Sequence, residues 1–285
     1  MWEALDRAIA AKLGRPWRTL SRRAVGGGCI NEAVTLEGEG LRFFVKLNRP
    51  EFADLFAAEA QALAEISVPG GPRVPQPVTF GTAGDRGFLV LEHLKLGQCG
   101  NFEHFGAALA RLHRKSAERF GWWRDNAIGA TPQANGWCAA WIEFWRRRRL
   151  EPQLDLAARR GLPIPQAARL LEDLPRFFTG YRPVPALLHG DLWSGNAAFD
   201  EAGAPVIFDP ASYYGDRESD LAMTELFGGF PPAFYRGYGQ EWPIAAGYEQ
   251  RRDLYNLYHV LNHFNLFGGD YGVQARALVG QLLGE

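Results

Sequence analysis

The chain has 285 residues, of which 47% are hydrophobic and 22% charged, as is ordinary for a globular protein of one large domain or two closely packed lobes. Its formal net charge of −1 gives no support for broad nucleic-acid binding, and the basic run Arg146-Arg147-Arg148-Arg149 is typical of a solvated helix face. No stretch is long and apolar enough to span a membrane and the N-terminus lacks a signal-peptide pattern, so we expect a cytoplasmic protein without nucleic-acid or membrane partners.

The first 94 residues predict a β-rich lobe. Leu5, Ile9 and Leu13 recur every four positions, which predicts an amphipathic helix over 2–13. Strand-like runs bounded by glycine turns then predict five strands, and a run rich in Ala, Leu and Glu predicts one main helix. The expected strands are 17–25, 31–36, 41–47, 78–81 and 87–94, and the expected main helix is 52–66.

Helical patterns dominate after a boundary near residues 94–100. The expected helices are 102–115, 137–150, 166–178 and 248–267. A sheet with one main helix, followed by mostly helices, is an α+β plan. We therefore predict two lobes, an N-terminal lobe of residues 1–94 built on a five-stranded antiparallel sheet and a mostly helical C-terminal lobe of residues 95–285.

A glycine cluster, Gly26-Gly27-Gly28, lies between the first two expected strands. Glycines let backbone N–H groups approach a phosphate closely and adopt positive φ angles. A plain hairpin turn is the alternative interpretation. No Gly-Lys-Ser/Thr follows, so the cluster is not a P-loop.

A lysine in the third expected strand indicates a phosphate-binding cation. Alternation places Lys46 on the same apolar face as Phe44, where an ammonium needs an anionic partner. The alternative is an edge lysine whose head reaches water. We expect the partner to be Glu59 because alanines precede and follow it, with Glu51 and Glu65 as alternatives.

The sequence from His189 to Asn196 is the strongest chemical signal. A loop carboxylate, Asp191, can deprotonate an attacking hydroxyl, and the amide oxygen of Asn196 can bind magnesium. His189 can hold the loop backbone through its ring nitrogens. Asp209 follows the apolar run Val206-Ile207-Phe208, where its carboxylate can bind the same metal. This order matches the phosphoryl-transfer template and predicts an enzyme that uses ATP and Mg²⁺.

The end of the fifth expected strand, Glu92-His93-Leu94, lies at the lobe boundary. Extended backbone there can offer N–H and C=O groups to an adenine ring. An ordinary core strand explains the same residues. We predict that the N-terminal lobe binds the nucleotide and that the C-terminal lobe holds the catalytic loop and the acceptor.

Taken together, these segments resemble the fructosamine kinase family, which includes the ketosamine-3-kinases and belongs to the protein-kinase-like superfamily with the aminoglycoside phosphotransferases and choline kinases. The resemblance spans about residues 17–267. The matching segments are 26–31, 44–46, 109–113, 189–196, 209–211 and 214–223. The Leu-Trp-Ser-Gly-Asn continuation of the catalytic loop and the Tyr-Gly-Asp-Arg-Glu run are the features most specific to fructosamine kinases.

The resemblance implies a two-lobed protein-kinase-like fold and ATP-dependent phosphorylation of the sugar 3-hydroxyl of ketosamines such as fructosamines, ribulosamines and erythrulosamines. The acceptors would be small ketosamines or glycated protein lysines, and the activity would remove glycation from proteins. It also places Trp193 beside the substrate, with Asp216 and Glu218 as partners of its hydroxyls or amine. The alternative for these two acids is a charged helix N-terminus.

The sequence leaves three further questions open. Cys29 lies within the glycine loop, and we hypothesise that it is redox-sensitive and forms a disulfide between two chains, the alternative being an inert residue. The oligomeric state is monomer or homodimer. The alternative functions are another small-molecule kinase of the superfamily, or a binding protein of this fold without catalysis.

Overall fold

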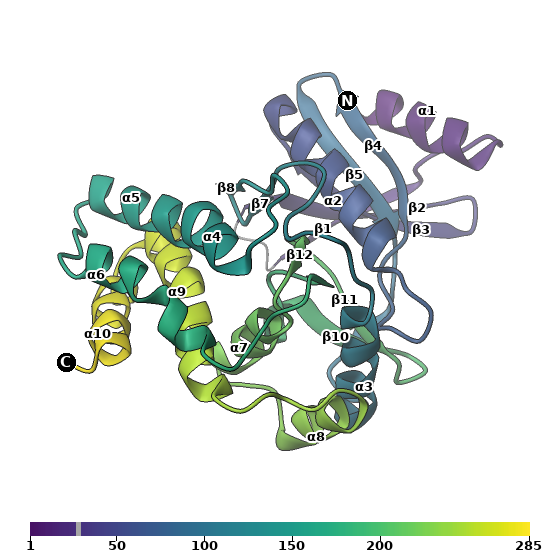
Figure 1. Cartoon of the computed structure of the whole chain (residues 1–285). Coiled ribbons are helices and arrows are strands. Elements are labelled where there is room, and N and C mark those ends of the chain that lie inside the picture. Colours follow the sequence, from purple (N-terminus) through teal and green to yellow (C-terminus); the bar gives the residue numbers. More distant parts are fainter. Residues whose placement is uncertain (27–29) are drawn as a thin grey trace.

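The structure is a computed structural model that describes residues 1–26 and 30–285. Its N-terminal part is a five-stranded antiparallel sheet in the order β1-β2-β3-β5-β4, as the sequence predicts (Figure 1). The strands are β1 (Ser21–Val25), β2 (Glu32–Gly38), β3 (Leu41–Asn48), β4 (Pro77–Ala83) and β5 (Arg86–Glu92).

Helices cover both faces of this sheet. Helix α1 (Trp2–Leu13) packs Leu5 and Ile9 against one face, in a core that includes Val45 and Val90. Helix α2 (Ala53–Ile66) packs on the other face, with Leu89 and Leu91 of β5. Because side chains alternate along a strand, Lys46 of β3 points to the α2 face. The alternation therefore determines that α2, and not α1, can supply a carboxylate partner for Lys46.

The C-terminal part is mostly helical (Figure 1). Its longest helix, α9, contacts α5, α7 and α10. The helices are α3 (Phe102–His113), α4 (Trp141–Trp145), α5 (Glu151–Arg159), α6 (Ala167–Glu172), α7 (Glu218–Leu226), α8 (Pro232–Glu241), α9 (Tyr248–Phe267) and α10 (Tyr271–Leu283). Short strands join them as β6 (Leu96–Gly97), β7 (Asn126–Ile128), β8 (Thr131–Gln133), β9 (Ala186–Leu187), β10 (Ala197–Asp200), β11 (Pro205–Ile207) and β12 (Tyr214–Gly215).

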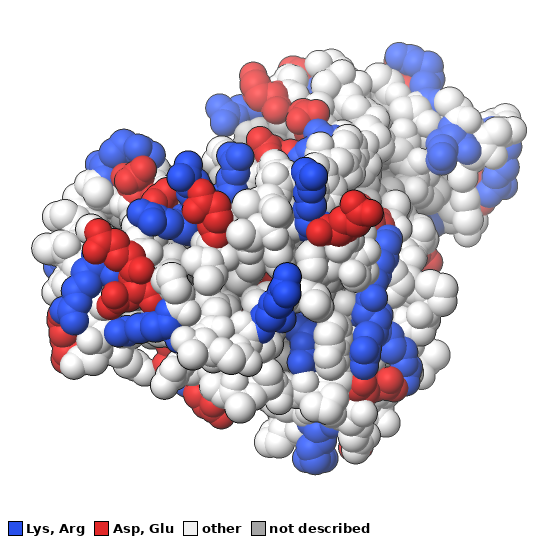
Figure 2. All heavy atoms as spheres, in the orientation of Figure 1, with Lys and Arg blue, Asp and Glu red and all other residues white. Residues whose placement is uncertain are grey.

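The expected helix over 137–150 differs from the structure. It begins at Trp141, passes through a π-helical turn at Arg146–Leu150 and continues as α5. Within that turn Arg147 and Arg148 are exposed, as predicted for a solvated basic face, but Arg149 is fully buried. Its guanidinium donates to Asn135 Oδ1 at 2.6 Å and lies 3.9 Å from the ring centre of Tyr213. On the face of the molecule that Figure 2 shows, basic and acidic side chains are interspersed.

The two parts of the chain are joined at several points. The connector before β4 pairs through the backbone of Arg73 with Val206 of β11, and the Arg73 side chain forms an ion pair with Asp200 of β10. The core around α2 is continuous with that of the helical part. The division at residue 94 therefore stays a prediction. No helix among residues 1–26 and 30–285 is long and apolar enough to cross a bilayer.

Candidate active site

A cavity of about 910 Å³ brings together most of the residues that the sequence singles out. Its lining comes from β3, α2 and residues 92–94 in the N-terminal part, and from the loop 189–196, α9 and α10 in the C-terminal part. The predicted site residues in this lining are Gly26, Lys46, Glu59, Glu92, His93, Leu94, Asp191, Trp193, Asn196 and Asp209. Gly27, Gly28 and Cys29 lie outside the described residues, so the glycine cradle and the redox hypothesis stay predictions.

Lys46 has two carboxylate partners. Its Nζ lies 2.6 Å from Glu59 Oε1 and 2.6 Å from Asp209 Oδ1. Burial opposes a charged ammonium, but the two carboxylates together raise the pKa of Lys46. The pairing with Glu59, expected over Glu51 and Glu65, is confirmed. It connects the sheet, α2 and the C-terminal part through one cation.

Asp191 lies in the loop of residues 189–196, which we predict to be the catalytic loop, and is in contact with Asn196. The Asn196 Nδ2 donates to the backbone oxygen of Asp191 at 2.8 Å and to its Oδ2 at 3.2 Å. Burial, and then the negative charge of Asp209, raises the pKa of Asp191 to about 7. A carboxylate with a pKa near neutrality is suited to accept a proton from a hydroxyl.

His189 holds the catalytic loop against the strand that leads to Asp209. Its Nε2 donates to the backbone oxygen of Phe208 at 2.9 Å, and its Nδ1 accepts from the Asp191 amide at 3.3 Å. Burial lowers the pKa of His189, which favours this neutral tautomer. Asp209 itself has a φ of 59°, a conformation that non-glycine residues seldom adopt and that is found at functional sites.

Asp220 anchors the same loop from helix α7, a role that sequence reasoning missed. Its carboxylate accepts the amides of His189 and Gly190 at 2.7 and 2.8 Å, and it pairs with His113 Nε2 at 3.1 Å. Burial acts to raise its pKa, but these hydrogen bonds prevail and lower the pKa of Asp220. The sequence marked 220 only as one acid in a charged helix start, because contacts across 30 residues leave no local pattern.

Helix α2 is anchored to the C-terminal part through Glu65, another contact that the sequence did not predict. One carboxylate oxygen accepts from Trp122 Nε1 at 2.7 Å, and the other accepts from the Tyr214 hydroxyl at 2.7 Å. Arg124 adds a bond to Gln61 of the same helix at 2.7 Å. These contacts hold the helix that carries Glu59 in place beside β3.

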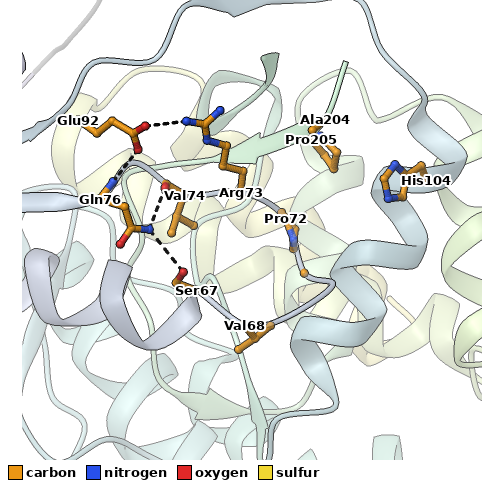
Figure 3. A pocket seen from close by; sticks show the side chains of 11 residues that line it. Ser67, Val68, Pro72, Arg73, Val74, Gln76, Glu92, His104, Ala204 and Pro205 are labelled. Atoms are coloured by element: carbon orange, nitrogen blue, oxygen red, sulfur yellow. Dashed lines mark hydrogen bonds and ion pairs between the residues drawn. The ribbon is translucent and has the colours of Figure 1, made fainter. Parts of the chain in front are cut away.

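Residues 92–94, at and just after the end of β5, all line the cavity, but the carboxylate of Glu92 is paired with Arg73. Figure 3 shows the carboxylate of Glu92 turned toward Arg73, at 2.6 Å, in a second pocket of about 380 Å³. Arg73 also pairs with Asp200 of β10 at 2.9 Å. Within the described residues no hydrogen bond occupies the backbone of His93 or Leu94, so these groups are free for an adenine edge.

Asp216 and Glu218, expected beside the substrate, are buried outside the cavity lining. The hydroxyls of Tyr181 and Tyr255 donate to Asp216 at 2.8 and 2.5 Å. Arg251 donates to Glu218 at 2.6 Å. Both carboxylates therefore have partners inside the protein, because the start of α7 points into the core rather than toward the cavity.

Trp193 lines the cavity as expected, and a glycine determines where its ring lies. A Cβ on Gly195 would meet the Trp193 ring at 2.3 Å, so the indole rests directly against the glycine backbone. The edge of the ring faces Phe227, with 5.9 Å between ring centres. The Trp-Ser-Gly sequence thus sets the orientation of the indole.

The residues present fit a magnesium ion. Because Asn196 Nδ2 donates to Asp191, its Oδ1 is left to accept or to ligate a cation. Asp209 keeps Oδ2 free after pairing with Lys46, and its side chain is 47% exposed toward the cavity. Two hard oxygen donors suit a magnesium ion that also binds water and phosphate oxygens.

This chain is similar to known proteins over nearly its whole length. A probable ketoamine kinase of Synechocystis sp. is 47% identical over 99% of this chain and 97% of its own length. The chloroplastic protein-ribulosamine 3-kinase of Arabidopsis thaliana is 41% identical over 91% of this chain and 82% of its own length. The crystal structure named "Putative fructosamine-3-kinase" from Haemophilus somnus superposes with a TM-score of 0.93 at 28% identity, covering 99% and 98% of the two chains. The fructosamine kinase family model matches residues 1–285, and the chain belongs to the fructosamine kinase family.

Proposed function

We propose that this protein transfers the γ-phosphoryl group of ATP to the 3-hydroxyl of a ketosamine. The observation that carries the proposal is that one cavity is lined both by a lysine held by two carboxylates and by an aspartate that can act as a base. Lys46, held by Glu59 and Asp209, forms the wall at the nucleotide end, and Asp191 with Trp193 forms the wall at the acceptor end. Family membership and the ketoamine and ribulosamine kinases among its relatives support this acceptor.

The proposed roles follow from the contacts. Lys46 binds the α- and β-phosphates, and the free backbone at His93 and Leu94 binds adenine. Asp191 orients the acceptor hydroxyl and takes its proton as the new O–P bond forms and the bond from the γ-phosphorus to ADP breaks. Asn196 and Asp209 hold Mg²⁺, which neutralises phosphate charge when bound. Asp216 and Glu218 position helix α7 rather than contact the acceptor.

The test measures ATP-dependent phosphate transfer to fructosamine, ribulosamine and erythrulosamine derivatives of lysine, with an aminoglycoside and choline as competing acceptors. We expect transfer to ketosamines alone, and none by Asp191→Asn, which should still bind nucleotide. Transfer to the aminoglycoside or choline instead would identify another small-molecule kinase. Nucleotide binding without transfer to any acceptor would indicate a binding protein. Peptide-bound and free lysine adducts, assayed in parallel, distinguish protein from metabolite substrates.

A further inference from the structure

Several aromatic rings from α9 and α10 line the same cavity as Trp193. His263 and Phe267 of α9 and Tyr271 of α10 line the cavity with Trp193. The His263 ring centre lies 5.8 Å from that of Phe267 and 5.2 Å from that of Tyr271. Phe227 packs behind them, 4.7 Å from His263 and 5.9 Å from Trp193. We call Trp193, His263, Phe267 and Tyr271 the aromatic box.

Among the described residues that line the cavity, no acid lies in the segments of α9 and α10 that carry the box. Of the acidic residues in the cavity lining, Glu59 is paired with Lys46 and Glu92 with Arg73. Asp191 and Asp209 belong to the catalytic loop and the proposed metal site. The lining contributed by residues 126–129 and 262–271 contains no Asp or Glu. A cationic group on the acceptor would therefore meet ring faces and neutral acceptors.

His263 supplies one such neutral acceptor. Its Nδ1 lies 2.8 Å from the backbone oxygen of His259, which can only accept, so Nδ1 carries the proton. The remaining nitrogen, Nε2, is then a free acceptor. Partial burial lowers the pKa of His263, which keeps the ring uncharged at neutral pH. A neutral imidazole accepts an N–H bond without repelling a cation.

We propose that the aromatic box binds the protonated amine of the acceptor, so that the enzyme recognises the nitrogen of a ketosamine by ring faces rather than by a salt bridge. The inference rests on the proposed function and specifies its acceptor site. Alkyl amines are cations near neutral pH, and a cation over an aromatic face is attracted by the ring quadrupole. The box thereby separates a sugar joined to an amine from a free sugar.

The box also opens to solvent. Phe267 is 53% exposed at the end of α9, whereas Asn262, five residues earlier in the same helix, is buried. An amine held in the box can therefore direct its substituent outward along Phe267. This geometry accommodates a long or bulky group on the nitrogen, including a lysine side chain that extends from a protein surface.

The test compares two acceptors that differ in one atom, a fructosamine with an alkylamine substituent and the corresponding 1-O-alkyl fructose ether. We expect wild-type kcat/KM to favour the amine by about tenfold or more, through KM. Phe267→Leu and Tyr271→Leu should each lower that amine-to-ether ratio several-fold, whereas Tyr271→Phe, which keeps the ring, should preserve it. Val273→Ala on α10, whose side chain is 72% exposed, is the matched control and should keep the wild-type ratio.

The outcomes separate the two proposals. Equal use of amine and ether by the wild type, or an unchanged ratio in both leucine variants, would overturn the aromatic box while leaving the kinase proposal intact. Failure of the wild type to phosphorylate either sugar would remove the proposed function, and the box with it. Because Phe267 is exposed, its substitution tests the box without loss of the fold, and thermal unfolding of each variant checks this.

Discussion

The ammonium of Lys46 lies 2.6 Å from Glu59 and 2.6 Å from Asp209, so a single side chain joins the sheet, helix α2 and the end of β11. These three residues are separated by up to 163 positions in the chain. In the proposed function, Asp209 Oδ2 binds the metal while Glu59 keeps the ammonium of Lys46 in place. The pair with Glu59 is thus the part of the contact that the proposed chemistry requires throughout.

Replacing Glu59 with Gln should raise the KM for ATP about tenfold, because the charge-assisted hydrogen bond that positions Lys46 becomes a neutral one. Steady-state kinetics at saturating acceptor measure this change. Glu51→Gln is the control, since Glu51 is exposed before α2 and should keep the wild-type KM. An equal rise in the KM for ATP in both variants would show that the overall negative charge, and not the pair of Lys46 with Glu59, determines this KM.

Replacing Gly195 with Ala should displace Trp193, because the added Cβ would lie 2.3 Å from the indole. We expect the KM for the acceptor to rise on the order of tenfold, through loss of ring contact with the substrate. In a double-mutant cycle, Trp193→Ala should make the Gly195→Ala substitution nearly silent. Gly239→Ala, which has open space around it, should leave the KM unchanged. Additive effects of the two substitutions would contradict this account.

Replacing Asp220 with Asn should lower kcat by up to about a hundredfold while nucleotide affinity changes little. An amide can accept only through one oxygen, so one of the His189 and Gly190 amides would face an NH₂ group and the loop would shift. Asp216→Asn is the matched control at the start of the same helix. Its Oδ1 accepts from the Glu218 amide and the Tyr181 hydroxyl, and an Asn Oδ1 can do the same. Its Oδ2 accepts only from the Tyr255 hydroxyl, which can reverse the hydrogen bond, so kcat should be largely kept. Comparable losses of kcat in both variants would contradict the positioning role of Asp220, because they would show that any substitution at the start of α7 lowers activity by destabilising the fold.

Replacing His259 with Gln should flatten the acid side of the stability profile. Burial, and then the charge of His263, lowers the pKa of His259 from its usual value near 6.5 to about 3. Between these values the unfolded chain binds a proton that the folded chain does not, so the free energy of unfolding falls as pH falls. The slope from this residue is at most about 1.4 kcal/mol per pH unit.

Urea unfolding between pH 7 and pH 4 would measure that slope in wild type and variant. His104→Gln, at an exposed position on α3, should retain the wild-type dependence. Identical profiles for wild type and His259→Gln would show that the protonation of His259 does not contribute to acid unfolding.

Local sequence patterns were sufficient to predict many of the helices and strands. The helices over 2–13 and 248–267 begin and end where the sequence predicts them, because both are long amphipathic segments with clear glycine boundaries. The five strands were also predicted, although β1 begins only at Ser21. Helices α8 and α10 were not predicted, since two glycines interrupt each of them. Gly237 packs against α3 and Gly272 packs against α9, contacts that the local sequence does not reveal.

The sequence by itself determined the chemical groups of the proposed site, because phosphoryl transfer needs Lys, Asp and Asn in a set order along the chain. Only the tertiary structure decided which side chains face the cavity. In the folded chain Asp216 and Glu218 are buried and bonded to Tyr181, Tyr255 and Arg251. Asp220 holds the loop 189–196 through hydrogen bonds to its backbone. The rings of α9 and α10 line the same cavity as Trp193. The physical reason is that a helix start such as 216–220 can turn its acids to solvent or core with the same local pattern, and the packing of distant helices makes that choice.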